Sequence, residues 1–121
     1  MNVLVLDDSV LLRKSLISIQ QGLGHKVVAE AGSGYEAIEA YKLHKPDIVT
    51  MDITMPGIQG IHNGVEALKE IKKINDDVKV VMITSHGEEE LVMDAISAGA
   101  KGYVLKPVTK EKVEAIFKKF S

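Results

Sequence analysis

Acidic side chains stand directly after two largely apolar stretches of this sequence. The first stretch, residues 3–6, is followed by Asp7 and Asp8, and the second, residues 48–51, is followed by Asp52. Carboxylates taken out of water are unfavourable unless a cation or hydrogen-bond donors compensate them. A hard divalent cation commonly does so, and Mg²⁺ leaves several coordination positions to water and phosphate oxygens. The acids therefore point to magnesium chemistry if the two stretches end side by side.

Two further apolar stretches lead into polar groups of other kinds. Residues 78–83 are followed by Thr84, and residues 103–105 are followed by Lys106 and Pro107. Open α/β sheets bind their ligands outside the carboxyl ends of the strands. If these stretches are parallel strands, the acids, a hydroxyl and an amine arrive at one rim of the sheet.

The rest of the sequence supplies the elements that such a rim requires. Short apolar runs alternate with helical apolar periodicity, which is typical of right-handed βαβ units in one parallel sheet. We expect strands at residues 3–6, 26–30, 47–52, 78–83 and 102–105. The predicted fold class is α/β, a single (βα)5 doubly wound sheet of five parallel strands with helices on both faces.

Capping residues and apolar spacing locate the helices between these strands. Ser9 and Thr109 are expected N-caps, and Glu88 begins an acidic run that suits the positive end of a helix dipole. Pro46 ends the second helix and favours an extended Lys45. The faces expected to be buried include Leu12, Leu16 and Ile19 on the first helix and Leu91, Ala95 and Ile96 on the fourth.

The composition excludes several classes of protein. The 121 residues carry a net charge of −2, so bulk electrostatics do not favour nucleic-acid binding. The absence of cysteine excludes disulfides, thiolate zinc sites and a cysteine nucleophile, and it suits a reducing cytoplasm. No apolar stretch approaches the roughly 18 residues of a membrane span, so membrane insertion is not expected.

Four segments together resemble the receiver domain of two-component response regulators, most closely a stand-alone, CheY-like receiver. They are VLDDS at residues 5–9, DIVTMDITMPG at residues 47–57, VMIT at residues 81–84 and GAKGYVLKP at residues 99–107. The resemblance covers essentially the whole chain and implies the flavodoxin-like strand order 2-1-3-4-5. It also implies one receiver domain over residues 1–121, with no output domain.

The resemblance gives roles to the acids. Asp52 corresponds to the phosphate acceptor, and Asp7 with Asp8 to the acidic pair that holds Mg²⁺, Asp8 directly and Asp7 through water. Asp52 and the backbone carbonyl of Thr54 would complete the protein ligands. Mn²⁺ or Ca²⁺ could replace Mg²⁺ in a crystal.

Four more residues receive roles in the same way. Lys106 would bind the phosphoryl oxygens, and Pro107 would follow a cis peptide bond that directs the lysine. Thr84 would move its hydroxyl toward the phosphoryl group, and Tyr103 stands at the position of the family's switch aromatic. Phosphorylation can shift such a switch only by the difference between its interaction free energies with the two conformations of Thr84 and Tyr103.

Two residues are expected to set the lifetime of the phosphate. In the family, the positions of Thr54 and His86 border the attacking water, so we expect both to tune self-dephosphorylation.

The sequence departs from the family pattern after the acceptor. Gly60 fits the glycine that ends the family's loop, but four extra residues, Ile61–Gly64, follow it. These residues either lengthen the loop or add a turn to the helix. Asn63 and Gly64 tolerate positive φ and punctuate helices, so we favour a longer loop and a helix that begins near Gly64 or Val65. Gln59 stands where the family commonly has an acidic residue or asparagine. The family's contacts through this loop, including those to a phosphatase, are therefore the least transferable to this chain.

The predicted function is that of a cytoplasmic phosphoacceptor in two-component signalling, which catalyses only its own phosphorylation and dephosphorylation. A histidine kinase would phosphorylate Asp52, and an altered surface around the last two helices and the last strand would then meet an effector. That effector is a flagellar motor switch, as in chemotaxis, or a phosphotransfer protein, and a phosphatase is a further expected partner. Neither nucleic acid nor membrane is expected as a direct partner.

Other functions remain as alternatives. The chain could be a phosphorelay intermediate that passes its phosphate to a phosphotransfer protein. A small-molecule phosphohydrolase could use the same acids, but haloacid-dehalogenase-type enzymes have a second aspartate where this chain has Thr54. A flavodoxin shares the fold, but its first strand leads into a phosphate-binding loop rather than into Asp7 and Asp8.

Overall fold

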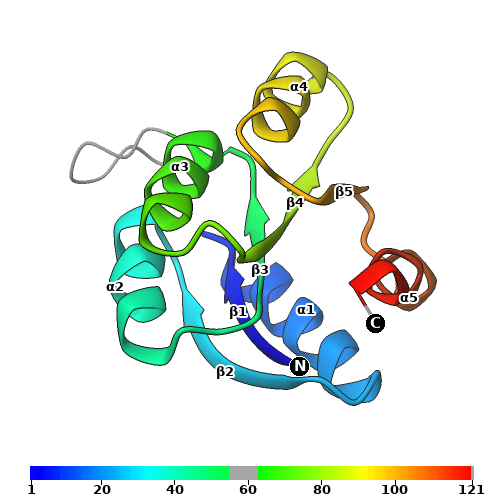
Figure 1. Ribbon diagram of the computed structural model, residues 1–121. Coiled ribbons are helices and arrows are strands. Elements are labelled where there is room, and N and C mark those ends of the chain that lie inside the picture. The colour runs from blue at the N-terminus through cyan, green and yellow to red at the C-terminus, as the bar shows by residue number, and fades with distance from the viewer. Residues whose placement is uncertain (55–62, 121) are drawn as a thin grey trace.

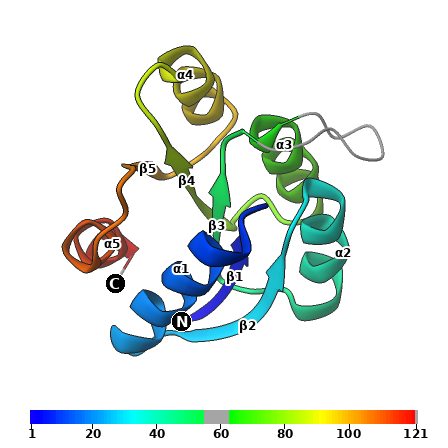
Figure 2. The same cartoon turned by 180° about the vertical axis from the view of Figure 1, so that it is seen from behind.

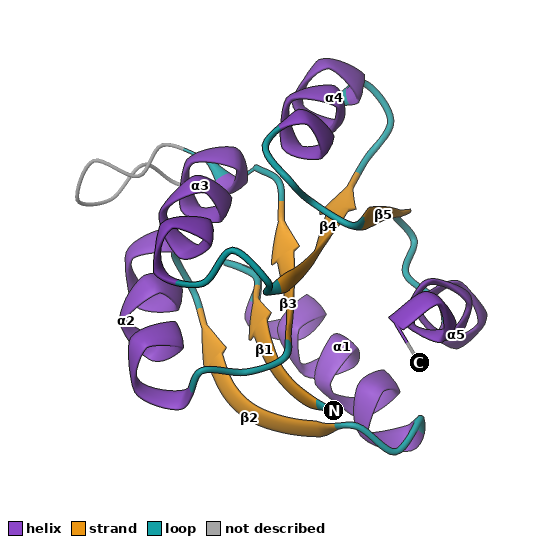
Figure 3. Ribbon diagram, in the orientation of Figure 1, coloured by secondary structure: helices purple, strands orange, loops and turns teal. Residues whose placement is uncertain are grey.

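The computed structural model describes residues 1–54 and 63–120, and within them strands and helices alternate from the first strand to the last helix (Figures 1 and 3). The strands are β1 (Asn2–Leu6), β2 (Lys26–Ala31), β3 (Ile48–Asp52), β4 (Lys79–Thr84) and β5 (Gly102–Leu105). The helices are α1 (Val10–Gly22), α2 (Gly34–His44), α3 (Gly64–Ile74), α4 (Glu89–Ser97) and α5 (Lys110–Phe117), with a final 3-10 turn η1 (Lys118–Phe120). The observed strand bounds lie within one residue of those expected.

The strands form one parallel sheet in the order β2-β1-β3-β4-β5. The expected fold class and strand order are therefore confirmed. In the register of the central strands, Leu6 pairs with Met51 and Asp52 pairs with Ile83. This register brings the carboxyl ends of β1, β3 and β4 to the same rim of the sheet.

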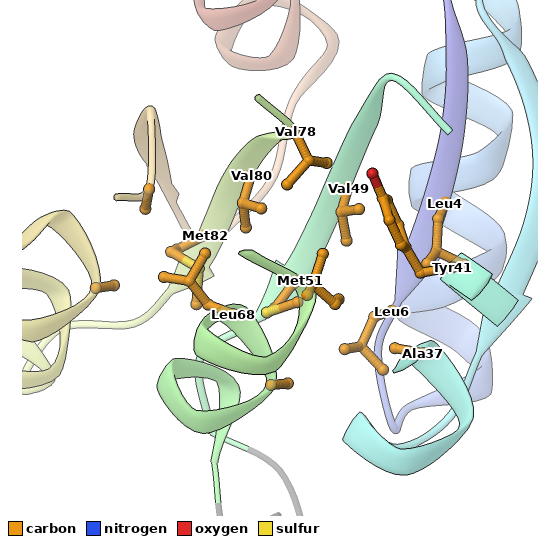
Figure 4. Close-up of a cluster of buried hydrophobic side chains, with 14 of the residues drawn as sticks. Leu4, Leu6, Ala37, Tyr41, Val49, Met51, Leu68, Val78, Val80 and Met82 are labelled. Carbon is orange, nitrogen blue, oxygen red and sulfur yellow. The ribbon is translucent and has the colours of Figure 1, made fainter. Parts of the chain in front are cut away.

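Alternating side chains along β1 divide the interior into two cores. Leu4 and Leu6 point into the core beneath α2, α3 and α4, which also contains Tyr41 (Figure 4). Val3 and Val5 point into the second core, beneath α1 and α5, and Figure 2 shows the molecule with α1 in front of the sheet. A strand that is buried on both faces reads as a largely apolar run, as residues 3–6 of β1 and 48–51 of β3 do.

Side chains cap four of the helices. The Ser9 hydroxyl accepts the N–H of Leu12 at 3.3 Å and the Thr109 hydroxyl accepts that of Lys112 at 3.3 Å, which confirms both expected N-caps. Asn63 caps α3, so the helix begins at Gly64 as expected. No helix of residues 1–54 and 63–120 has both the length and the apolar content to cross a bilayer.

Two predictions of buried residues are wrong. Leu12 is 39% exposed, because in the first turn of α1 it lines a cavity beside Asp7 and Pro107 instead of packing in the core. Ile96 is 45% exposed, because α4 turns only Ala95 fully into the core and directs Ile96 toward the groove beside Tyr103.

Candidate functional site

Three carboxylates meet at the rim of the sheet. One oxygen each from Asp7, Asp8 and Asp52 lies within 4.8 Å of the other two. The pairing of Leu6 with Met51 explains this proximity, because each of these two residues is followed directly by an aspartate. The structure therefore brings together the acids that the sequence singled out.

Two of these carboxyl groups are withdrawn from water. Asp7 is fully buried and Asp52 is 3% exposed, whereas Asp8 is exposed. Burial raises the pKa of Asp52 to about 6, with the nearby Lys106 opposing the rise and Asp7 adding to it. Burial also raises the pKa of Asp7, although the Ser9 N–H and the Lys106 charge oppose this.

One buried carboxylate oxygen lacks a partner. Asp7 Oδ1 accepts the N–H of Ser9 at 2.9 Å, but Asp7 Oδ2 has no hydrogen-bond partner within residues 1–54 and 63–120. Asp52 Oδ1 accepts the N–H of Thr54 at 3.3 Å. An unpartnered buried oxygen beside two other carboxylates is the donor set that a hard divalent cation such as Mg²⁺ prefers, so the residues fit such an ion.

Lys106 supplies the positive charge in the pocket. Its Nζ lies 3.4 Å from Asp52 Oδ2, and its backbone N–H donates to the Thr84 carbonyl at 2.7 Å. The peptide bond between Lys106 and Pro107 is cis. The end of β5 thus directs an amine toward the acid at the end of β3.

Thr84 is joined to a residue that the sequence analysis did not single out for the site. Its hydroxyl donates to Glu88 Oε1 at 3.1 Å, and the Ser85 N–H donates to the same oxygen at 2.5 Å. Burial raises the pKa of Glu88, but hydrogen bonds from Ser85, Thr54 and Thr84, with the charge of Lys106, outweigh it and lower the pKa below its ordinary value. An acid at the start of a helix is so common that only the fold reveals this contact.

Tyr103 and His86 lie on an adjoining groove rather than among the acids. The groove has a volume of about 450 Å³ and is lined chiefly by apolar side chains of α4 and β5, and Thr84 is also among its lining residues. The Tyr103 side chain is 51% exposed and lines this groove, as does the exposed His86.

Part of the departure from the family pattern falls outside the described residues. Gln59, Gly60 and the first two extra residues, Ile61 and His62, lie there, so the expectation of a lengthened loop stays a prediction.

Comparisons with known proteins identify the family of this chain. Residues 3–118 match the response regulator receiver domain. The chemotaxis protein CheY of Bacillus subtilis is 45% identical over 117 residues, which cover 96% of this chain and 94% of that protein. CheY of Thermotoga maritima is 43% identical over 119 residues, with 98% and 96% covered.

A solved structure gives the same result. The CheX–CheY–BeF3–Mg²⁺ complex from Borrelia burgdorferi contains a chain that superposes with a TM-score of 0.90 at 37% identity, covering 99% of this chain and 88% of that one. Sequence, strand order and structural similarity therefore agree, and the chain belongs to the response regulator receiver domain family, as a CheY-like protein of two-component signalling.

Proposed function

We propose that this chain is the phosphate-accepting receiver of a chemotaxis-type two-component system and that Asp52 is its acceptor. The observation that carries the proposal is the 3.4 Å separation between Lys106 Nζ and Asp52 Oδ2, in the pocket that also holds Asp7 and Asp8. A nucleophilic carboxylate with a cation beside it is what phosphoryl transfer requires.

The reaction follows from these groups. An oxygen of Asp52 attacks the phosphorus of a phosphohistidine on a histidine kinase, the new P–O bond forms as the P–N bond breaks, and the imidazole leaves. The pKa of about 6 leaves most of Asp52 ionised and nucleophilic at neutral pH. The Lys106 ammonium then stabilises the negative charge on the transferred oxygens.

The acids would hold a magnesium ion. Asp7, Asp8, Asp52 and the backbone carbonyl of Thr54 are the proposed protein ligands, and the bound ion would supply positive charge to the phosphoryl oxygens. The unpartnered Oδ2 of Asp7 supports this assignment. The similar CheY complex with BeF3 and Mg²⁺ supports it independently.

The groove beside α4 supports the proposed switch. A phosphoryl group on Asp52 offers new acceptor oxygens to the Thr84 hydroxyl, and movement of Thr84 makes room for the Tyr103 ring. The ring is half exposed and lines the same groove as Thr84, so the two side chains that the switch would move lie along one surface. The surface of α4, β5 and α5 would thereby change for an effector such as a flagellar motor switch or a phosphotransfer protein.

Phosphorylation by a small donor tests the proposal. Incubation with acetyl phosphate and Mg²⁺ should add the mass of one phosphoryl group to the wild-type chain and none to Asp52→Asn. Asp77→Asn removes an exposed acid in the turn after α3 and should be modified like the wild type. A wild-type chain that stays unmodified, or an Asp52→Asn chain that is modified equally, would refute the proposal.

A further inference from the structure

The Glu88 side chain turns away from the helix that it begins. Glu88 occupies the N-cap position of α4 but makes no side-chain capping bond to that helix. Its Oε1 instead accepts the Thr84 hydroxyl at 3.1 Å and the Ser85 N–H at 2.5 Å. A further side-chain hydrogen bond joins it to Thr54. The carboxylate thus spans from the end of β4 to the segment after β3.

The groups that Glu88 binds lie next to the acceptor. Asp52 pairs with Ile83 in the sheet, so Thr84 and Ser85 continue β4 just past the acceptor. Lys106 donates its backbone N–H to Thr84 and its ammonium to Asp52, and that ammonium also attracts the Glu88 carboxylate. A phosphoryl group on Asp52 would bring its oxygens into reach of the same donors.

Two anions cannot share these donors without repulsion. A carboxylate oxygen and a phosphoryl oxygen both need N–H or O–H donors, and each charge-assisted hydrogen bond to one leaves a donor unavailable to the other. We propose that Glu88 is an internal anion that occupies the phosphoryl-oxygen donors in the unmodified protein and is displaced when Asp52 is phosphorylated. This inference rests on the function proposed above.

Displacement of Glu88 would act directly on α4. The residue before it, Gly87, has a φ of +94°, a conformation in which the chain reverses sharply between β4 and α4. Within α4 only Ala95 is fully buried, and the hydrogen bonds of Glu88 tie the start of this helix to the end of β4. Loss of that contact therefore links phosphorylation to the groove between α4 and β5.

Substitution of Glu88 tests whether its carboxylate competes with the phosphoryl group for the same donors or makes only a structural contact. In the presence of Mg²⁺, Glu88→Ala should bind beryllofluoride about tenfold more tightly than the wild type, the effect expected for removing one charge-assisted hydrogen bond to a competitor. Glu88→Gln keeps an acceptor oxygen without the charge and should fall between the two. Glu90→Ala removes an equal charge from the exposed side of the same helical turn and should bind like the wild type.

Equal or weaker binding of beryllofluoride by Glu88→Ala would overturn the inference. A gain of the same size in Glu90→Ala would also overturn it, because the effect would then be general electrostatics. Calorimetry gives these affinities, with Asp52→Asn as the chain expected not to bind.

A second measurement does not depend on phosphate chemistry. In the metal-free protein, the Ser85 amide should be protected from hydrogen exchange in the wild type and in Glu90→Ala, and unprotected in Glu88→Ala. Unchanged protection in Glu88→Ala would refute the resting contact. If no variant binds beryllofluoride but the Ser85 amide loses its protection, the phosphoacceptor function fails while the contact stands, and the competition proposed for Glu88 is then refuted.

Discussion

Gly64 lies directly against the backbone of Asp52. A Cβ atom built on Gly64 would stand 2.5 Å from the carbonyl oxygen of Asp52, and the Gly64 N–H donates to the Ile53 carbonyl at 2.8 Å. The first residue of α3 is thus hydrogen-bonded to the segment that carries the proposed acceptor. Glycine is required here by this close approach, whereas the sequence analysis invoked its tolerance of positive φ.

Gly64→Ala should therefore destabilise the fold and disturb the site together. We expect a loss of about 2 kcal/mol in the free energy of unfolding, because backbone atoms must shift to admit the methyl group, and slower phosphorylation of Asp52. Gly22→Ala is the matched control, since a Cβ at the end of α1 meets nothing within 4 Å. Urea unfolding and acetyl phosphate turnover measure both effects, and equal stability of the two variants would contradict this reading.

Because Asp52 is buried, ionisation of its carboxyl should lower the free energy of unfolding in a pH-dependent way. The carboxyl has an ordinary pKa of 3.8 and a pKa of about 6 in the folded chain, so below pH 3.8 it is protonated in both states. As the pH rises from 3.8 to about 6, the unfolded chain releases this proton while the folded chain retains it, so roughly 3 kcal/mol of stability is lost over that range. In metal-free buffer Asp52→Asn should therefore be more stable than the wild type at pH 7.5, with the advantage vanishing near pH 4.

Urea unfolding in EDTA at several pH values tests this prediction. Asp77→Asn, which removes an exposed carboxylate, should show no such gain at pH 7.5. An Asp52→Asn chain with an advantage that is the same at pH 4 and pH 7.5 would show that burial of the charge is not the cause.

Magnesium should stabilise the folded chain. At a Mg²⁺ concentration about tenfold above Kd, ligand linkage contributes about 1.4 kcal/mol, enough to raise Tm by several degrees. Asp8→Asn and Asp52→Asn should lose most of this rise, because each removes a charged oxygen ligand, and EDTA should abolish it in the wild type. An undiminished rise in Asp8→Asn would place the ion elsewhere.

His86 and Thr54 are predicted to tune the lifetime of the acyl phosphate. Both are exposed near the proposed site, where they can obstruct or orient the attacking water. His86→Ala should shorten the lifetime several-fold by admitting water more freely, and Thr54→Ala should also change it. The decay of phosphorylated protein, followed by mass spectrometry, measures the lifetime, with His44→Ala at the end of α2 as the control; unchanged decay in both site variants would refute this role.

Tyr103 should become less exposed when the site is filled. Its side chain is 51% exposed, and beryllofluoride with Mg²⁺ should lower the accessibility of its ring as seen by photo-CIDNP NMR. The same spectra contain two references, the buried Tyr41 and the 43% exposed Tyr35, which should not change. Thr84→Ala should bind beryllofluoride but leave Tyr103 exposed, and a ring that responds equally in that variant would contradict coupling through Thr84.

The sheet and its polar rim could be predicted because they depend on local patterns. Apolar runs of strand length located all five strands to within one residue, and the end of each central strand placed Asp7, Asp52 and Thr84 at one rim. Ser9 and Thr109 were identified as caps because the capping bond is made within one helical turn.

The wrong predictions concern residues whose tertiary contacts outweigh the local sequence pattern. Lys45 is expected to be extended before Pro46, but it forms the left-handed cap that ends α2, with φ 46° and ψ 58°, and its N–H donates to the Tyr41 carbonyl at 2.8 Å. Glu88 was read as a helix-dipole acid, since nothing in the sequence shows that Gly87 turns it back toward Thr84. Leu12 and Ile96 both follow the helical period. Leu12 nevertheless lines a cavity at the start of α1, and Ile96 lines the groove between α4 and β5.

The two apolar cores and the reactive rim occupy separate parts of each strand. On β1, Val3 to Leu6 fill the interior, and the acids begin only at the next residue. Substitutions on the outer surfaces of the helices can therefore change what the protein contacts without repacking the interior. The architecture thus separates the side chains that stabilise the fold from those that are free to vary at the surface.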